Sequence, residues 1–164
     1  MRQIAQAALL IVVFLIVEGL AQLPELKKVE VNSVEIHYIE KGSGEPLILL
    51  HGGLFDHRSW APQFEEFAKR YRVISYSRRY SFPNKNTIDP AYRPAISDAA
   101  DLKALIKKLG LKRVHLVGLS YGAFTGLIFA AENPKMVGSM VLAEPPAHQL
   151  IRDLPDGEQL YQVF

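Results

Sequence analysis

The sequence predicts an α/β fold in which a mostly parallel sheet carries helices on both faces. Short runs of consecutive apolar residues, typical of strands buried on both faces, alternate with longer segments of helical periodicity. A Gly-x-Ser-x-Gly pentapeptide between one such run and one such segment marks an abrupt turn from strand to helix. Hydrophobic residues are 49% of the 164 residues, which is enough to form a core.

Each predicted element follows from a local pattern. Alternating apolar side chains around Asn32 and Ser33 predict an antiparallel hairpin over residues 28–40. A helix is predicted over residues 96–109, because four apolar residues share one of its faces and Gly110 follows it. Further strands are predicted at residues 46–50, 72–76, 114–117 and 136–143, and further helices at residues 60–71 and 123–131.

Ser120 is the predicted nucleophile. It sits at the turn between a strand and a helix, where the backbone approaches itself so closely that Gly118 and Gly122 must be small. The turn lifts the hydroxyl out of the backbone, and the amide of Tyr121 can then donate to an oxyanion. Glycines also serve ordinary helix packing, but the strand before and the helix after favour the nucleophile.

A second glycine turn follows the buried strand at residues 46–50. His51, Gly52 and Gly53 end that strand, and Gly53 is the predicted second oxyanion donor, with His51 and Gly52 supporting the loop. Alone, this tripeptide is equally consistent with a simple turn. Its place upstream of Ser120, with a helix and a strand between, strengthens the oxyanion interpretation.

These motifs together resemble the α/β-hydrolase superfamily, in the branch related to small esterases and carbon–carbon bond hydrolases. The resemblance runs from about Lys28 to about Leu150. It implies a serine hydrolase that cleaves an ester, thioester or related carbonyl compound through an acyl-enzyme at Ser120, with neither a cofactor nor a metal. The alternative is a non-catalytic binding protein or pseudoenzyme that keeps the pocket.

The chain departs from the family pattern at residues 77–84, where many relatives carry Asp-x-Arg-Gly-x-Gly. This leaves the subfamily open. The segment contains the basic pair Arg78 and Arg79, which we expect in a solvated loop; the alternative is recognition of an acidic substrate group.

The resemblance also implies a triad in the chain order serine, acid, histidine. We expect the usual acid and the histidine beyond Phe164, with the core truncated after about its sixth strand. In this interpretation residues 22–147 are the N-terminal part of the core, and residues 148–164 begin an incomplete cap domain. A chain without its general base would turn over esters poorly.

Two alternatives for the missing groups lie within the chain. Glu144 follows the last predicted strand and is a possible acid, although it also suits a polar exit into a turn. Among the histidines, His57 and His148 lie on predicted loops near the site and are better candidates for the base than His51.

Residues 1–21 are predicted to be a signal peptide. Arg2 precedes an apolar run at residues 7–17, and small residues at 19–21 suit cleavage. The protein is therefore expected to be secreted or periplasmic, and an uncleaved N-terminal membrane anchor is the alternative.

Net charge and sequence motifs limit the classes of partner that we expect for this protein. The net charge is only +2, which argues against a nucleic-acid partner. Neither a metal-ligand spacing nor a phosphate-binding glycine loop is present in the sequence. A small-molecule substrate remains the expected ligand.

Overall fold

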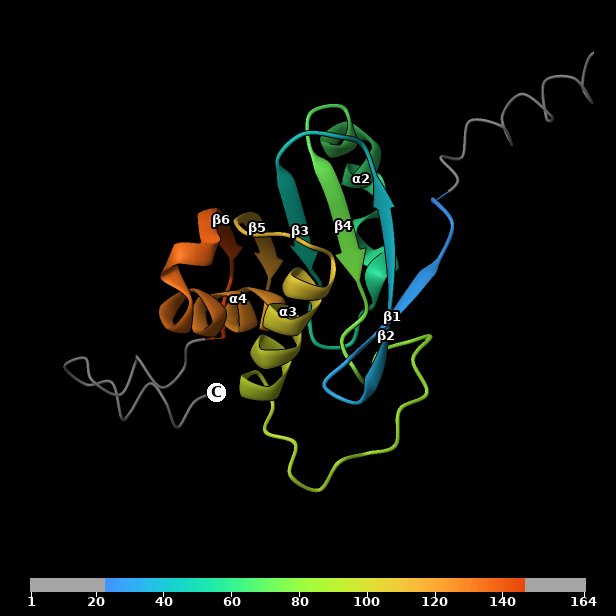
Figure 1. Cartoon of the computed structure of the whole chain (residues 1–164), viewed down its shortest axis with the longest axis vertical. Helices are drawn as coiled ribbons and strands as arrows, with labels where there is room; N and C mark the ends of the chain where they lie inside the picture. The colour runs from blue at the N-terminus through green and yellow to red at the C-terminus, as the bar shows by residue number, and fades with distance from the viewer. Residues whose placement is uncertain (1–22, 147–164) are drawn as a thin grey trace, which may run out of the picture.

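Six strands form a single sheet in the computed structural model, which describes residues 23–146 (Figure 1). The strands are β1 (Lys27–Val31), β2 (Val34–Lys41), β3 (Pro46–Leu50), β4 (Arg72–Tyr76), β5 (Val114–Leu119) and β6 (Val137–Ala143). Their order across the sheet is β1-β2-β4-β3-β5-β6. β2 pairs antiparallel with β1 and β4, whereas β4, β3, β5 and β6 are parallel neighbours. The predicted mostly parallel sheet is confirmed.

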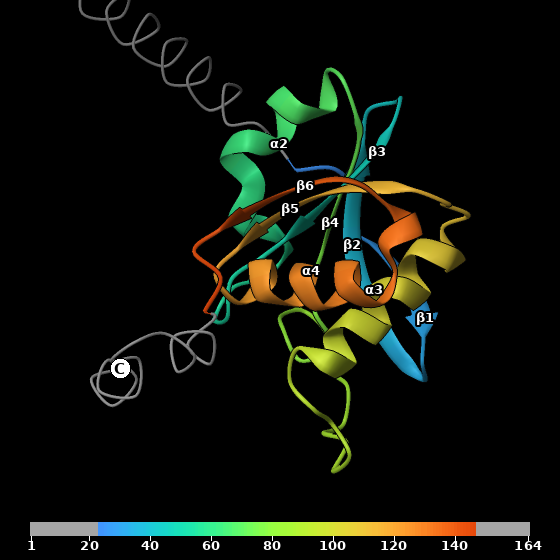
Figure 2. The ribbon, with the colours of Figure 1, turned by 90° about the vertical axis from the view of Figure 1, so that its left-hand side faces the viewer.

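Helices cover both faces of the sheet, as predicted. Figure 2 shows α2 on one face and α3 and α4 together on the other. Their bounds are α2 (Ala61–Ala68), α3 (Ile96–Lys108) and α4 (Tyr121–Glu132), with short 3₁₀ turns at η1 (His57–Trp60) and η2 (Pro134–Met136). The helix predicted over residues 60–71 ends three residues early, because the chain turns back there to enter β4.

Alternate side chains of β3 supply the two halves of the core. Leu47 and Leu49 pack in the cluster that contains Phe64 of α2. Ile48 and Leu50 point the other way, into the larger cluster formed with α3 and α4. A strand buried on both faces needs apolar residues at every position, which is why β3 is a continuous apolar run.

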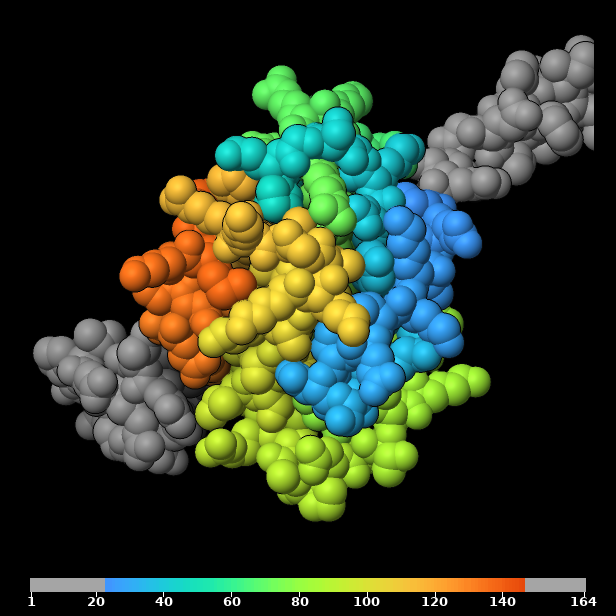
Figure 3. All heavy atoms as spheres, viewed as in Figure 1, coloured from blue at the N-terminus to red at the C-terminus, as the bar shows by residue number. Residues whose placement is uncertain are grey.

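The hairpin of β1 and β2 closes the α3 side of the molecule. Asn32 and Ser33 both have positive φ, at 48° and 61°, as a two-residue hairpin turn requires. Figure 3 shows the blue hairpin beside the yellow α3, and the Asn32 side-chain amide donates to Asp101 of that helix at 2.9 Å. The turn is therefore anchored to the helix it covers.

A long loop, residues 77–95, connects β4 to α3. Two of its asparagines bind the backbone of β2: Asn84 accepts from the His37 amide at 3.0 Å, and Asn86 accepts from the Glu35 amide at 2.9 Å. The loop is thus fixed along the strand even though it forms neither helix nor strand itself.

The predicted leader at residues 1–21 and the predicted cap at residues 148–164 lie outside the described residues. Over residues 23–146, none of the helices has the length and apolar character needed to cross a membrane.

Candidate active site

Ser120 lies between β5 and α4 in a strained backbone conformation. Its φ is 51° and its ψ is −122°, a combination that costs a non-glycine residue about 1–3 kcal/mol. Neighbouring hydrogen bonds hold it there: the Ser120 amide donates to the Ala143 carbonyl at 2.8 Å, and the Ser120 carbonyl accepts from the Phe124 amide at 3.1 Å. Strain of this kind is characteristic of functional sites.

The two glycines that flank Ser120 are forced by close backbone approach. A Cβ on Gly118 would lie 2.7 Å from the Cα of Ala123. A Cβ on Gly122 would lie 2.4 Å from the Leu50 carbonyl oxygen, on the strand that leads into the second glycine loop. The packing that excludes a side chain at Gly122 therefore also brings α4 against the end of β3.

His51 is buried at the end of β3 and orders that loop. Its Nδ1 lies 2.8 Å from the Gly52 carbonyl oxygen, and its Nε2 accepts the Arg78 amide at 3.1 Å. These partners assign the proton to Nδ1 and leave the ring neutral. Burial first, and then the positive charge of Arg78, lower the pKa of His51 to about 3. Both ring nitrogens are engaged, so His51 is not available as a general base.

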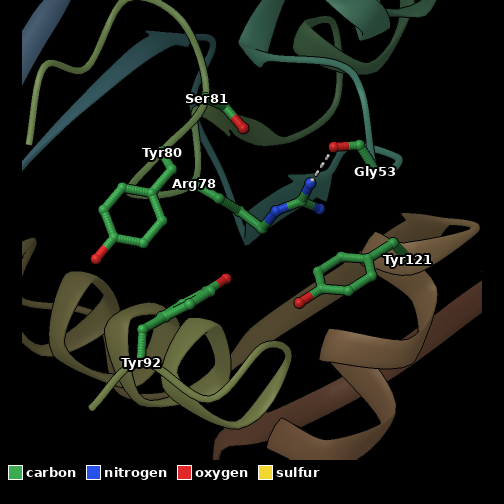
Figure 4. Close-up of a pocket in the computed structure, with 6 residues that line it drawn as sticks. All are labelled: Gly53, Arg78, Tyr80, Ser81, Tyr92 and Tyr121. Carbon is green, nitrogen blue, oxygen red and sulfur yellow. Dashed lines mark hydrogen bonds between the residues drawn. The ribbon is translucent and has the colours of Figure 1, made fainter. Parts of the chain in front are cut away.

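Gly53 emerges from this buried loop beside Tyr121. Gly53 is exposed although His51 and Gly52 are buried, and a Cβ on it would lie 3.9 Å from the Tyr121 Cβ. Both residues line a cavity of about 260 Å³, which is drawn in Figure 4. The cavity is also lined by Arg78, Tyr80, Ser81 and Tyr92. The two predicted oxyanion donors thus belong to residues that adjoin one hollow.

The expectation that Arg78 and Arg79 form a solvated pair is wrong. Arg78 is 8% exposed and Arg79 is 6% exposed. Arg78 turns inward because the carbonyls of the loop after β3 accept its hydrogen bonds, and the Asp98 carboxylate lies 3.6 Å from its Nε as a counter-charge. Arg79 turns inward because its Nε and Nη2 both donate to Asp101, each at 2.7 Å. Buried charges must be paired, and both arginines are.

Sequence reasoning missed Asp98, which is buried in the first turn of α3. Tyr92 donates to its Oδ2 at 3.0 Å, and the Arg78 Nε lies 3.6 Å from the same oxygen. Burial raises the pKa of the Asp98 carboxyl, and the charge of Arg78 only partly opposes that rise. An acidic residue in the first turn of a helix is ordinary in sequence, so the pattern carried no signal for this role.

Glu144 follows β6 immediately and has a positive φ of 50°. The preceding residue, Ala143, accepts the Ser120 amide, so Glu144 lies at the same edge of the sheet as Ser120. Its side chain is exposed. No hydrogen bond within residues 23–146 links it to a histidine, so its role as the acid remains a prediction.

The four histidines of the described residues bind other groups. His51 contacts the Gly52 carbonyl and the Arg78 amide, and the Nδ1 of the buried His57 lies 2.9 Å from the Ser77 hydroxyl. His37 binds Asn84, and His115 binds Ser139 and Glu45. The remaining candidate base, His148, lies outside the described residues.

Over the part of the chain that the structure describes, there is no group of three or more acidic, histidine or cysteine residues able to hold a metal ion. The cavity lies next to Ser120 in the chain, because Tyr121, which follows Ser120, is one of its lining residues.

Comparison with known proteins decides the family. Residues 45–164 match the model of the alpha/beta hydrolase fold. The chain belongs to the α/β-hydrolase family. Over 125 residues it is 32% identical to the 2-hydroxy-6-oxo-6-phenylhexa-2,4-dienoate hydrolase of Comamonas testosteroni, covering 74% of this chain and 43% of that protein. It is 36% identical over 121 residues to the serine hydrolase BPHL of Mus musculus, and the match covers 70% of this chain and 41% of that protein.

Solved structures agree with this assignment. The structure of an epoxide hydrolase mutant from Vigna radiata covers 71% of the present chain and 37% of its own chain, with a TM-score of 0.67 and 29% sequence identity. A bacterial membrane phospholipase A covers 82% of this chain and 43% of its own, with a TM-score of 0.69 and 29% identity. The chain thus spans about two fifths of the length of the relatives it matches.

Proposed function

We propose that this α/β-hydrolase is a serine hydrolase that cleaves an ester, thioester or related carbonyl substrate through an acyl-enzyme at Ser120. The observation that carries the proposal is the strained backbone of Ser120 at the start of α4. The next residue, Tyr121, lines one cavity together with Gly53. A mouse relative with 36% identity is named a serine hydrolase, and this supports the proposal.

The proposed reaction uses Ser120 and Tyr121 at the start of α4 and Gly53 on the loop after β3. The Ser120 oxygen attacks the substrate carbonyl carbon, and the carbonyl oxygen becomes an oxyanion that accepts from the amides of Gly53 and Tyr121. The carbonyl then re-forms and the bond to the alkoxy or alkylthio group breaks. That group leaves as an alcohol or thiol with the proton lost by the Ser120 hydroxyl, and an ester bond joins the acyl group to Ser120. The described histidines bind other groups, so we assign them no part in this step.

The competing hypothesis is a non-catalytic binding protein of the same fold. It is favoured by the engagement of both His51 nitrogens and of His57 with other partners. The hypotheses differ in whether a covalent bond forms at Ser120, and this difference can be measured without sustained turnover.

The test mixes the 164-residue chain with p-nitrophenyl butyrate and follows p-nitrophenolate release. A serine hydrolase releases at least one equivalent per chain and gains one butyryl group in mass, whereas Ser120→Ala does neither. A binding protein shows no mass gain, and the two chains then behave alike. Ser139→Ala is a matched control, because Ser139 is an exposed serine on β6.

We also propose that the protein is exported, on the basis of the apolar run at residues 7–17 and the small residues after it. Amino-terminal sequencing of protein made in a secreting host tests this. A start near Gln22 supports a cleaved leader, and a membrane fraction that retains Met1 supports the anchor instead.

A further inference from the structure

We propose that Arg78 is a positioning residue that orients the oxyanion-binding amide of Gly53. The inference rests on the proposed function, because it assigns a purpose to the geometry around Ser120. It concerns the segment that departs from the family pattern, residues 77–84, for which the sequence suggested a solvated basic pair or, alternatively, recognition of an acidic substrate group.

Arg78 binds three consecutive carbonyls of the loop after β3. Its Nη1 donates to the His51 carbonyl at 2.7 Å, and its Nη2 donates to the carbonyls of Gly52 and Gly53 at 2.9 and 3.0 Å. Figure 4 shows the guanidinium reaching from its own loop toward the Gly53 carbonyl. One side chain therefore fixes the direction of three successive peptide groups.

The carbonyl direction determines the amide direction. The Gly52–Gly53 peptide is trans and planar, so its N–H, which belongs to Gly53, points opposite to its C=O. Because the Gly52 carbonyl points at Arg78, the Gly53 amide points away from Arg78. Glycine resists rotation less than any other residue, so this peptide depends on restraints. Arg78 shares that task with His51 Nδ1 and the Phe55 amide, which lie 2.8 and 3.4 Å from the same Gly52 carbonyl.

The same guanidinium also contacts the other proposed donor. It lies over the Tyr121 ring at 4.5 Å from the centroid, and the Tyr121 hydroxyl accepts the Ala95 amide at the start of α3. The Arg78 Nε lies 3.6 Å from the carboxylate of Asp98, which is on α3. Arg78 thus contacts Gly53, Tyr121 and the α3 residue Asp98.

Positioning fits these contacts better than substrate binding. The guanidinium is buried and already held by three carbonyls and a carboxylate, so it is a poor ligand for a substrate anion. Arginine suits the task because its planar fork can donate to several acceptors in fixed directions, which the single ammonium of lysine cannot.

The test compares Arg78→Lys with Arg79→Lys. Both substitutions keep a buried cation and remove a planar fork, but Arg79 donates to Asp101 and makes no hydrogen bond to the loop after β3 in the described structure. Arg78→Met, which removes the cation as well, is the stronger variant. If Arg78→Met does not fold, the two lysine variants decide the matter.

The first readout is independent of catalysis. Sodium butyrate, which carries the carboxylate of a butyryl ester product, is titrated into the ¹⁵N-labelled chain, with sodium chloride as the ionic-strength control. We expect butyrate to shift the Gly53 and Tyr121 amide resonances in the wild-type chain and in Arg79→Lys. In Arg78→Lys we expect the free Gly53 resonance to be displaced and about 10-fold more butyrate to be needed, by analogy with loss of part of an oxyanion donor.

The second readout is the single-turnover rate of butyryl transfer to Ser120. Full loss of one oxyanion donor costs about 10²–10³ in rate, so partial misorientation should slow Arg78→Lys by about 10–100-fold. The ester concentration that gives half the maximal rate should change little, because the amides act mainly on the transition state.

Three results would contradict the positioning role of Arg78. Arg78→Lys could match the wild type in both readouts, which would mean that charge alone suffices. Arg79→Lys could be slowed equally, which would indicate general loosening. The Gly53 resonance could also be insensitive to Arg78→Met. Failure of the proposed function gives a distinct pattern, in which no butyryl group reaches Ser120 in any variant although Gly53 still responds to Arg78→Lys.

Discussion

Two glycines at the turn around Ser120 are required by neighbouring backbone, and Gly53 is not. The space for a Cβ on Gly118 and Gly122 is occupied by main-chain atoms that cannot move aside, whereas a Cβ on Gly53 would meet ordinary contact distances. Residue identity at Gly118 and Gly122 is therefore set by sterics, whereas the proposed role of Gly53 needs only its backbone amide.

We expect Gly122→Ala to lower the free energy of unfolding by about 1–3 kcal/mol, since the added methyl group would clash with the Leu50 and His51 carbonyls. Gly53→Ala is the matched control and should stay within about 0.5 kcal/mol of the wild type. Urea denaturation measures both. Equal stability of the two variants would show that the close approach of α4 to β3 is not rigid.

The buried His51 should make the stability of the fold depend on pH. The pKa of His51 is lowered from 6.5 to about 3 in the folded chain, mainly by burial. Between these values the unfolded chain binds more protons, so this contribution to stability is present above pH 6.5 and is lost as the pH falls toward 3.

Replacing His51 by Gln should reduce the slope of unfolding free energy against pH by about 1 kcal/mol per pH unit between pH 4 and 6. The pKa of His57 is also lowered, again mainly by burial, and this contribution remains in both proteins. Denaturation at several pH values gives the two slopes. Parallel slopes would show that His51 is protonated in the folded chain.

At the scale of elements, Asp101 joins three parts of the chain. It lies on α3, accepts the Asn32 side chain from the hairpin turn at 2.9 Å, and accepts two donors of Arg79 from the loop of residues 77–95. Both charged partners are buried, so removal of one leaves the other unpaired.

Arg79→Met should therefore cost about 3–5 kcal/mol of stability, because a buried carboxylate loses its counter-charge. Lys69→Met is the control, since Lys69 forms an exposed ion pair with Glu66 on α2, and we expect no measurable effect from it. Thermal or urea unfolding distinguishes the two. A similar small loss in both variants would mean that water solvates Asp101.

Strands and helices could be predicted because their signals are local. The apolar run of β3 and the periodicity of α3 can each be read within one short stretch of sequence. The Gly-x-Ser-x-Gly between strand and helix is explained by the close approach of the backbone around it. The roles of Arg78 and Asp98 could not be predicted, because the acceptors of Arg78 lie 25 to 27 residues upstream. Only the folded sheet brings them together.

At the scale of the whole molecule, β6 forms one edge of the described sheet and carries exposed apolar side chains. Met140 is 41% exposed and Val141 is 62% exposed. An apolar edge strand with free backbone groups is a template for association with another chain.

Val141→Lys should accordingly reduce self-association of the 164-residue chain at high concentration, since a charge on an edge strand opposes pairing. Ile88→Lys is the matched control, because Ile88 is 77% exposed but lies in the loop before α3. Light scattering against concentration compares them. Equal association of both variants would place the contact elsewhere.

The most direct test of the central claim is to locate the butyryl group after reaction with p-nitrophenyl butyrate. Ser120 is the only serine between Arg113 and Lys135, so trypsin isolates it in one peptide that tandem mass spectrometry can sequence. We expect the butyryl group on Ser120 and no label on this peptide in Ser120→Ala. A label on Tyr121, Thr125 or another peptide, with Ser120 unmodified, would contradict it.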